Sequence, residues 1–239
     1  MYQRSCFAVA LIVLALSFAA AVSYGQESHL GSKRIPWSLT VVVLDGTDQT
    51  DQAETPVAEA IEFIEANSRF DIDVEFVTAS VYHEFTPYKF GADLDGDGQG
   101  DETRYAMLGW NLPDSLIESL PTSSSYLFLY KLYWNEPAQA GSALGLDFGL
   151  LKGGKPRPYA TVPTDQWWYV NQPAQGFRNW AAQVLTHEIV NTIQGKIEAA
   201  PYKCGQLTGT HGLPGNKYEA ERLASITSQC YESLGDNDN

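Results

Sequence analysis

The chain has 239 residues, with 29 acidic and 15 basic side chains and a formal charge of −14. A surface this acidic repels nucleic acid and anionic membranes, so it excludes partners of both classes and remains compatible with calcium or cationic partners. The hydrophobic fraction of 44% and the aromatic fraction of 12% are sufficient for the core of one domain.

The first 25 residues have the pattern of a secretory signal peptide. Arg4 supplies a positive start, Phe7 to Val22 is almost wholly apolar, and Ser23 to Gly25 offers small residues for cleavage. The apolar run of about 16 residues is short for a membrane span, although a retained N-terminal anchor is the alternative. We expect a secreted or periplasmic protein that has no membrane contact once the signal is cleaved.

A single domain is predicted over residues 37–231, after a polar and flexible lead-in over residues 26–36. Residues 37–45 are rich in β-branched side chains and predict a buried strand. Residues 71–79 alternate between apolar and polar, which indicates a half-buried strand. A helix lies between the two, and this order favours a crossover that joins parallel strands.

The helix between these strands is predicted over residues 56–67. Thr55 is a typical N-cap residue, and Pro56 suits the first helical position, where no N–H is needed. Apolar residues recur at helical spacing and form one face of an amphipathic helix. This face consists of Val57, Ile61 and Ile64.

The segment over residues 93–102, DLDGDGQGDE, alternates carboxylates with glycines. It resembles the calcium loops of EF-hands, where alternate aspartates converge on one hard cation and a glycine at the sixth position, here Gly98, permits the turn. The twelfth position holds Arg104 instead of Glu, so the loop would be a shortened one. A solvated acidic loop without a cation is the alternative. The calcium candidates are Asp93, Asp95, Asp97, Asp101 and Glu102.

Further elements follow before the C-terminal part of the chain. A short helix is predicted over residues 112–120, and the most apolar strand, expected to be central, over residues 126–134. Residues 159–162 lie between prolines, which favours an edge strand. The aromatic run Trp167 to Tyr169 either lines a groove for carbohydrate or peptide or covers the edge of the core.

A long amphipathic helix is predicted over residues 177–200. Near its middle, HEIVN at residues 187–191 differs by one residue from HExxH, in which two histidines one turn apart bind zinc and the glutamate is the general base. His187 and Asn191 project from the same face because residues four apart do so in a helix. An amide oxygen is a weaker zinc ligand than imidazole, so this site would bind zinc less tightly or prefer a harder ion.

A third ligand for such a site has to come from elsewhere in the chain. Glu221 is the first choice, because it begins a Glu-x-x-Ala pattern on a second helix predicted over residues 218–231. His211, in the loop before that helix, is another choice. Glu198 is on the same helix as His187 but 11 residues further on, too far along the axis.

Two cysteines, Cys204 and Cys230, remain once Cys6 leaves with the signal. An even pair in an exported chain predicts a disulfide, which would contribute about 3 kcal/mol to stability. A Cys–His metal site is the alternative, disfavoured by an oxidising compartment. Residues 232–239 are polar and are expected to form a disordered tail.

The element order, with His187 and Glu188 near the middle of a long helix, resembles the zincin metallopeptidases, and the metzincin branch is closest in layout. The resemblance implies an α+β fold with a twisted mixed sheet packed by the helix over residues 56–67 and by the long helix. It also implies that His187 binds zinc and that Glu188 deprotonates the water that attacks a peptide or protein substrate.

The sequence departs from the metzincin pattern at three points. Asn191 replaces the second histidine, Gly195 falls eight rather than seven residues after His187, and no methionine follows the helix. The Glu221 pattern points instead to the gluzincin branch. Two functions therefore stay open: a secreted zinc-metallopeptidase-like protein, active or degenerate, and a non-catalytic, calcium-stabilised binding protein on the same scaffold.

Overall fold

The computed structural model describes residues 33–44, 50–80, 86–90, 92–106, 112–130, 142–144, 157–164, 180–198, 204–205, 207 and 216–237. The predicted signal peptide, His211 and the aromatic run Trp167 to Tyr169 lie outside these ranges. Within the described part, the helices are too short or too polar to span a membrane.

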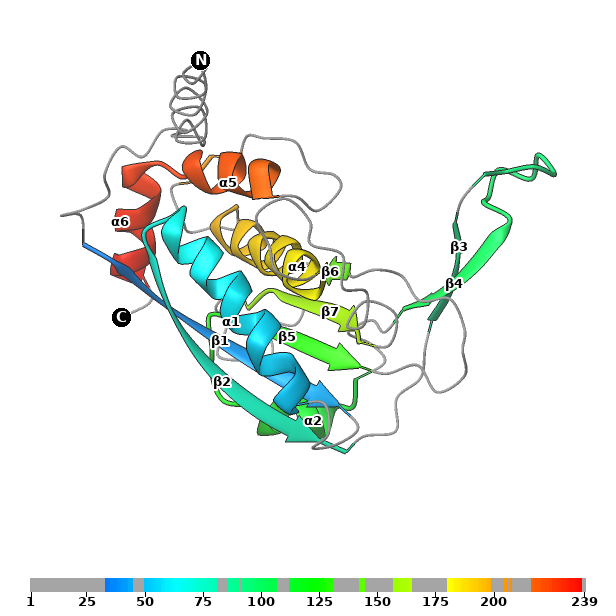
Figure 1. Cartoon of the computed structure of the whole chain (residues 1–239), viewed down its shortest axis with the longest axis horizontal. Helices are drawn as coiled ribbons and strands as arrows, with labels where there is room; N and C mark the ends of the chain where they lie inside the picture. The colour runs from blue at the N-terminus through cyan, green and yellow to red at the C-terminus, as the bar shows by residue number, and fades with distance from the viewer. Residues whose placement is uncertain are drawn as a thin grey trace, which may run out of the picture. The chain divides into compact units, whose positions relative to one another are not determined.

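A five-stranded sheet in the order β2-β1-β5-β7-β6 carries the fold (Figure 1). β1 (Ile35–Leu44) is parallel to β2 (Phe70–Ala79) and to β5 (Ser125–Tyr130), and β5 is parallel to β7 (Tyr159–Pro163). The short β6 (Ser142–Leu144) is antiparallel to β7 at one edge. Four parallel strands with intervening helices make a mixed α/β arrangement, and the predicted parallel crossover is confirmed.

The central strands are buried on both faces, as parallel strands covered by helices must be. All six residues of β5 are buried, and so are residues 39–44 of β1. This explains why both segments are continuous apolar runs in the sequence. The predicted central position of β5 is confirmed, and residues 131–134 of the predicted strand lie outside the described residues.

β7 is not the edge strand that its flanking prolines predict, because it lies between β5 and β6. Pro158 precedes the strand, and its carbonyl accepts a hydrogen bond from Tyr126 N–H at 3.1 Å. Pro163 is the last strand residue, and Thr164 N–H donates to Tyr130 O at 2.9 Å directly after it. The missing proline N–H groups therefore fall at the ends of the ladder, where they do not interrupt it.

Helices cover both faces of the sheet. α1 (Thr50–Ala66) and α4 (Trp180–Ile197) lie side by side over one face, and their apolar residues form a continuous core with those of β1 and β5 (Figure 1). The short α2 (Asp114–Ser119) contributes Ile117 to a second core on the opposite face. The expected packing of the sheet by two helices is therefore confirmed in its coarse form.

α1 begins at Thr50, so the predicted start at Pro56 is wrong. Ala53 is fully buried and extends the apolar face of Val57 and Ala60 by one turn towards the N-terminus. Burial of this extra turn outweighs the hydrogen bond that Pro56 cannot donate within the helix.

The C-terminal region holds two helices, α5 (Asn216–Ala224) and α6 (Ser228–Asn237), where the sequence predicts one over residues 218–231. The break coincides with Thr227, whose Oγ1 accepts a hydrogen bond from Cys230 N–H at 3.2 Å, as an N-cap residue does. α6 also extends into the stretch from residue 232 onwards, for which the sequence predicts a disordered tail. Leu234 in this stretch is buried in the core, and its burial explains the longer helix.

A separate two-stranded antiparallel sheet consists of β3 (Thr86–Phe90) and β4 (Glu102–Ala106). Pro87 is opposite Tyr105 within this pair. The aspartate-rich loop connects the two strands.

Candidate functional site: a buried polar network between α4 and α5

α4 carries the HEIVN motif into the interior, because all of residues 181–190 are buried. His187 is 9% exposed and Glu188 is 5% exposed. Polar groups this deep require hydrogen-bond partners inside the protein, since leaving one unsatisfied costs about 1–3 kcal/mol. The partners of this motif therefore decide what it can do.

The partner of His187 comes from α5. His187 Nδ1 lies 2.8 Å from Glu219 Oε1, and the second carboxylate oxygen, Oε2, accepts a hydrogen bond from Arg222 NH1 at 2.8 Å. Glu219 is 1% exposed and Arg222 is 2% exposed. A buried charge is stable only when it is paired, and these two residues supply each other's counter-charge.

Arg222 also bonds back to α4. Its NH2 donates to Asn191 Oδ1 at 2.7 Å and to Gln194 Oε1. Asn191 in turn donates from Nδ2 to Glu188 Oε2 at 3.3 Å. The guanidinium therefore lies against the face of α4 that carries the motif, and it supplies the hydrogen-bond donor for the amide oxygen of Asn191.

Burial raises the pKa of the Glu188 carboxyl above its ordinary value, and the neighbouring His187 and the hydrogen bond from Asn191 oppose the rise. A raised carboxyl pKa suits a general base or acid, but burial of an ordinary structural carboxyl has the same effect. The shift alone does not make Glu188 catalytic.

The contact with Glu219 sets the role of one ring nitrogen of His187. The Glu219 carboxylate is an acceptor that already takes a hydrogen bond from Arg222, so Nδ1 of His187 donates to it. Histidines that bind a metal through one nitrogen commonly donate from the other to a carboxylate in the same way. His187 by itself thus has the form of a metal ligand.

The described residues around His187 nevertheless do not fit zinc. Asn191 Oδ1, the ligand atom that the motif would supply, accepts a hydrogen bond from a guanidinium, and a zinc ion bound to it would lie next to that positive charge. Glu219 is occupied by His187 and Arg222. Among the His, Cys, Asp and Glu side chains of the described ranges, the set of three that lies close enough to share an ion is far from this motif in sequence, at Asp93, Asp95 and Asp97.

The carboxylate that contacts His187 is Glu219 and not the predicted Glu221, whose side chain is exposed on α5. The sequence carries a signal for this that the Glu-x-x-Ala pattern obscures. Glu219 precedes the buried Leu223 by four residues and so shares its face of the helix, whereas Glu221 precedes it by two and faces away. Arg222, three residues after Glu219, was likewise not predicted.

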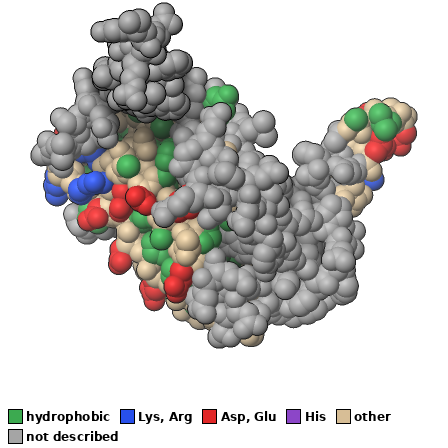
Figure 2. All heavy atoms as spheres, viewed as in Figure 1, with side chains coloured by type: hydrophobic (Ala, Val, Ile, Leu, Met, Phe, Trp, Pro, Cys, Tyr) green, Lys and Arg blue, Asp and Glu red, His purple; other side chains and the backbone are tan. Residues whose placement is uncertain are grey.

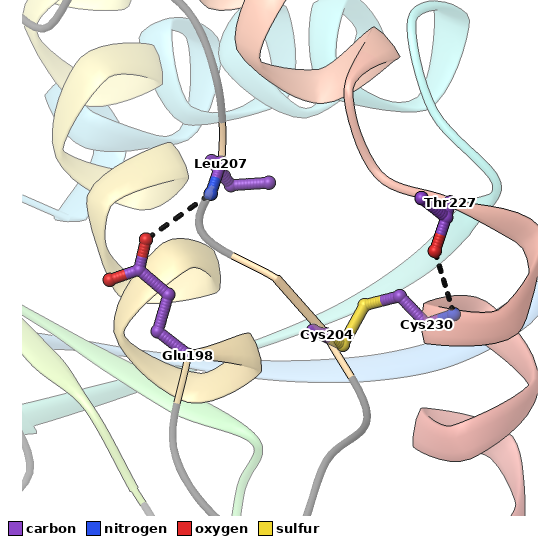
Figure 3. The surroundings of a disulfide bond; sticks show 5 residues. All are labelled: Glu198, Cys204, Leu207, Thr227 and Cys230. Carbon is purple, nitrogen blue, oxygen red and sulfur yellow. Dashed lines mark hydrogen bonds between the residues drawn. A yellow bond between two sulfur atoms is a disulfide. The ribbon is translucent and has the colours of Figure 1, made fainter.

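The network continues from α4 towards the disulfide (Figure 3). Gln194 Nε2 donates to Glu198 Oε1 at 2.7 Å, and that oxygen accepts the N–H of Leu207 at 3.3 Å. Cys204, three residues earlier, is bonded to Cys230 of α6, which confirms the predicted disulfide. Glu198 is therefore a link between the end of α4 and the segment that the disulfide anchors, and it is not a ligand.

The aspartate loop brings Asp93, Asp95 and Asp97 together in the β3–β4 connection, with one carboxylate oxygen of each within 4.8 Å of the others. Backbone N–H groups of the loop also bond to these carboxylates, as from Gly96 and Gly98 to Asp93 at 2.7 and 2.9 Å. Both glycines have positive φ, of 78° and 87°, which permits the two tight bends.

The remaining calcium candidates do not belong to this group. Asp101 Oδ2 accepts the N–H of Leu94 at 2.6 Å and closes the base of the loop. Glu102 is the first residue of β4, opposite Phe90. The structure thus brings together three of the five carboxylates that the sequence suggests.

Comparison with solved structures finds distant likenesses, and archaemetzincin is one of them. The crystal structure of archaemetzincin from Methanopyrus kandleri is similar with a TM-score of 0.35 and 13% identity, over 87% of this chain and 96% of that chain. No family model matches the chain, and no curated protein matches it. A likeness of this size carries no argument about function, which has to rest on the residues themselves.

Proposed function

We propose that this chain is an exported, metallopeptidase-like protein that does not hydrolyse peptides and acts by binding. One observation carries the proposal: Arg222 NH2 donates to Asn191 Oδ1 at 2.7 Å. A fixed guanidinium is the resident cation of the site, next to the position where a zinc ion would need the amide oxygen. Export is supported by the signal-like pattern over residues 1–25 and by the disulfide.

The hydrogen bonds of the network hold the Arg222 guanidinium in place. Its guanidinium donates to Glu219, Asn191 and Gln194, and it is almost fully buried. Removal of the guanidinium would leave the Glu219 carboxylate buried without a counter-charge, at a cost of several kcal/mol. A zinc ion cannot take over this role without a rearrangement of α5 against α4.

The second candidate function is zinc-dependent peptide hydrolysis, favoured by the contact between His187 Nδ1 and Glu219. Metal-binding histidines commonly make such a contact to a carboxylate through the ring nitrogen that does not bind the metal. His211, the remaining predicted ligand, lies outside the described residues.

Metal analysis separates the two functions. The protein is purified without chelator, exposed to equimolar zinc, and dialysed, and the zinc per chain is measured together with cleavage of a fluorogenic peptide mixture. We expect well under one zinc per chain and no cleavage that Glu188→Gln removes. About one zinc per chain, together with cleavage that Glu188→Gln abolishes, would overturn the proposal in favour of the second candidate.

Calcium at the aspartate loop is a separate part of the proposal. It is supported by the alternation of carboxylates in the sequence and by the approach of Asp93, Asp95 and Asp97 to one another. Calcium there would relieve the repulsion between the carboxylates and order the connection between β3 and β4.

A further inference from the structure

A groove of ≈ 550 Å³ follows the boundary between α1 and β2. Both α1 and β2 contribute apolar side chains to its lining, and those of Val74 and Phe76 on β2 are half-buried. Carboxylates line the α1 side, and one guanidinium, that of Arg34, is also present. The apolar residues are Val57, Ala58, Ile61, Ala66, Ile72, Val74 and Phe76, and the acidic ones are Glu54, Glu62 and Glu65.

β2 is the outermost strand of the sheet on this side, among the strands that the structure describes. The N–H of Ile72 donates to Glu65 Oε1 at 2.7 Å and so points away from β1. Backbone groups of alternate strand residues point to the same side, so the N–H and C=O of Val74 and Phe76 also face outwards. The groove therefore adjoins a strand edge that presents main-chain donors and acceptors.

The charge along this edge is strongly negative on both faces of the strand. Asp71, Asp73 and Glu75 are exposed on the face of β2 that points away from α1. On the α1 side, Glu54, Glu62 and Glu65 line the groove. The one guanidinium there, that of Arg34, donates through NH1 to the backbone carbonyls of Glu65 and Phe70. Figure 2 shows acidic side chains beside hydrophobic ones over the region of α1 and β2.

These features exclude a second copy of the same edge as the partner. Two β2 edges side by side would bring aspartates and glutamates opposite one another, and like charges across a strand pair are destabilising. A segment with basic side chains is attracted at the same positions. An exposed edge, an adjacent apolar groove and flanking carboxylates together define both the conformation and the chemistry of a ligand.

We propose that the edge of β2 and the adjoining groove bind an extended peptide segment in which apolar and basic residues alternate. The segment adds one strand to the sheet through the outward main-chain groups of Val74 and Phe76. Side chains alternate between the two faces of a strand, so the apolar ones enter the groove against α1, and the basic ones meet Asp71, Asp73 and Glu75. A core of about five to seven residues matches the length of this edge.

This inference rests on the proposed function in one respect, that the protein acts by binding. It adds the surface that binds and the class of partner. The groove lies along α1 and β2, whereas the buried network joins α4 to α5. Peptide binding at β2 therefore stands or falls separately from the absence of zinc hydrolysis.

The test uses fluorescein-labelled peptides and the purified protein, with binding followed by fluorescence anisotropy at low and physiological salt. The first probe alternates valine and lysine over seven residues. A second has the same composition with the lysines and valines in two blocks. A third has the alternating sequence with N-methyl groups on the residues that would bond to β2, which removes donors without a change of charge. The fourth alternates valine and glutamate.

Matched variants test the location. Asp73→Lys with Glu75→Lys, the first groove variant, reverses two charges on the face of β2 that meets the basic side chains of the peptide, and Glu118→Lys with Glu232→Lys makes the same net change at exposed positions of α2 and α6. Phe76→Lys places a charge in the groove itself. Circular dichroism and thermal unfolding of each variant establish that it is folded before its affinity is compared.

We expect the alternating basic peptide to bind at least about tenfold more tightly than the block and N-methylated peptides, and the acidic peptide not to bind. The groove variants should weaken binding roughly tenfold, and the α2 and α6 variant at most about twofold. Equal affinity for the N-methylated peptide, or equal losses in the groove and control variants, would overturn the inference in favour of diffuse charge attraction. Cleavage of the bound probe would contradict the proposed function and leave this inference intact.

Discussion

His187 and Asp93 both belong to motifs for which the sequence predicts a bound metal ion. Their surroundings differ in burial and in the charges that lie nearby. The network around His187 is buried and contains its own cation, the Arg222 guanidinium. The aspartate loop is exposed and gathers three carboxylates, with hydrogen bonds from its own backbone but no basic side chain among them.

The difference shows that spacing alone does not make a metal site. The spacing of HEIVN places side chains on one face of a helix, but it does not predict which residues of another helix contact that face. Arg222 comes from α5 and converts the ligand face of α4 into an internal ion-pair network. The spacing of the aspartate loop is local, so the convergence that it predicts does not depend on distant residues.

Replacement of Arg222 is the change that separates the two regions most strongly. Arg222→Met leaves Glu219 buried without a counter-charge and should lower the free energy of unfolding by about 3–5 kcal/mol, measured by urea denaturation. The double variant Arg222→Met, Glu219→Leu should recover part of this loss, because both charges are then absent. Asp95→Asn in the exposed loop should change stability by less than about 0.5 kcal/mol.

The control for this prediction is Glu221→Gln, which alters an exposed neighbour on the same helix. It should also stay within about 0.5 kcal/mol of the native protein. A loss below about 1 kcal/mol for Arg222→Met would mean that the guanidinium is not held in the network and that the site is open to a metal.

Removal of the disulfide should affect the buried region and leave the exposed loop unchanged. Cys204→Ala with Cys230→Ala opens a link across a sequence separation of 26 and should cost about 3 kcal/mol. Hydrogen exchange read by mass spectrometry should become faster in α5 and α6 and stay the same in β3 and β4. Faster exchange that is equal in all of these elements would show that the disulfide acts through global stability alone.

The raised pKa of Glu188 predicts a pH dependence for the buried network. A carboxyl whose folded pKa lies above its ordinary value of 4.5 stabilises the fold below that value, and this stabilisation is lost as the pH rises through the raised pKa. Glu188→Gln removes the loss, so the variant should have a higher Tm than the native protein at neutral pH. The difference should shrink towards about pH 4, and a difference independent of pH would contradict the assignment.

Calcium should produce the smallest effect on global stability and a local one in the exposed loop. We expect binding with a Kd of about 10⁻⁴–10⁻³ M, typical of extracellular modules, and slower hydrogen exchange in β3 and β4 but not in α4. Asp93→Asn with Asp97→Asn should abolish the response. Unchanged exchange at about 10 mM calcium would establish the loop as a solvated acidic turn.

Much of the fold follows from local patterns. The apolar runs of β1 and β5 and the alternation of β2 record burial directly, so these strands were predictable, and the helix between β1 and β2 predicted the parallel order of those two. The start of α1 and the place of β7 were not, because each depends on a tertiary choice that overrides a proline signal. Ala53 gains burial, and the prolines beside β7 fall at the ends of its ladder.

The candidate site was predictable on one helix only. Helical geometry alone predicts that His187, Glu188 and Asn191 project from neighbouring positions on one side of α4. Glu219 could have been found from its four-residue spacing to Leu223. The contact between Arg222 and Asn191 could not, because it depends on how α5 lies against α4, and no spacing within either helix specifies that.

The bond between Cys204 and Cys230 has a consequence for proteolysis of the chain. Any single backbone cut between residues 205 and 229 leaves two fragments that remain covalently joined. α5, with Glu219 and Arg222, lies wholly inside this stretch. A nicked molecule would therefore keep α6 attached to the main chain and would separate into two pieces only after reduction.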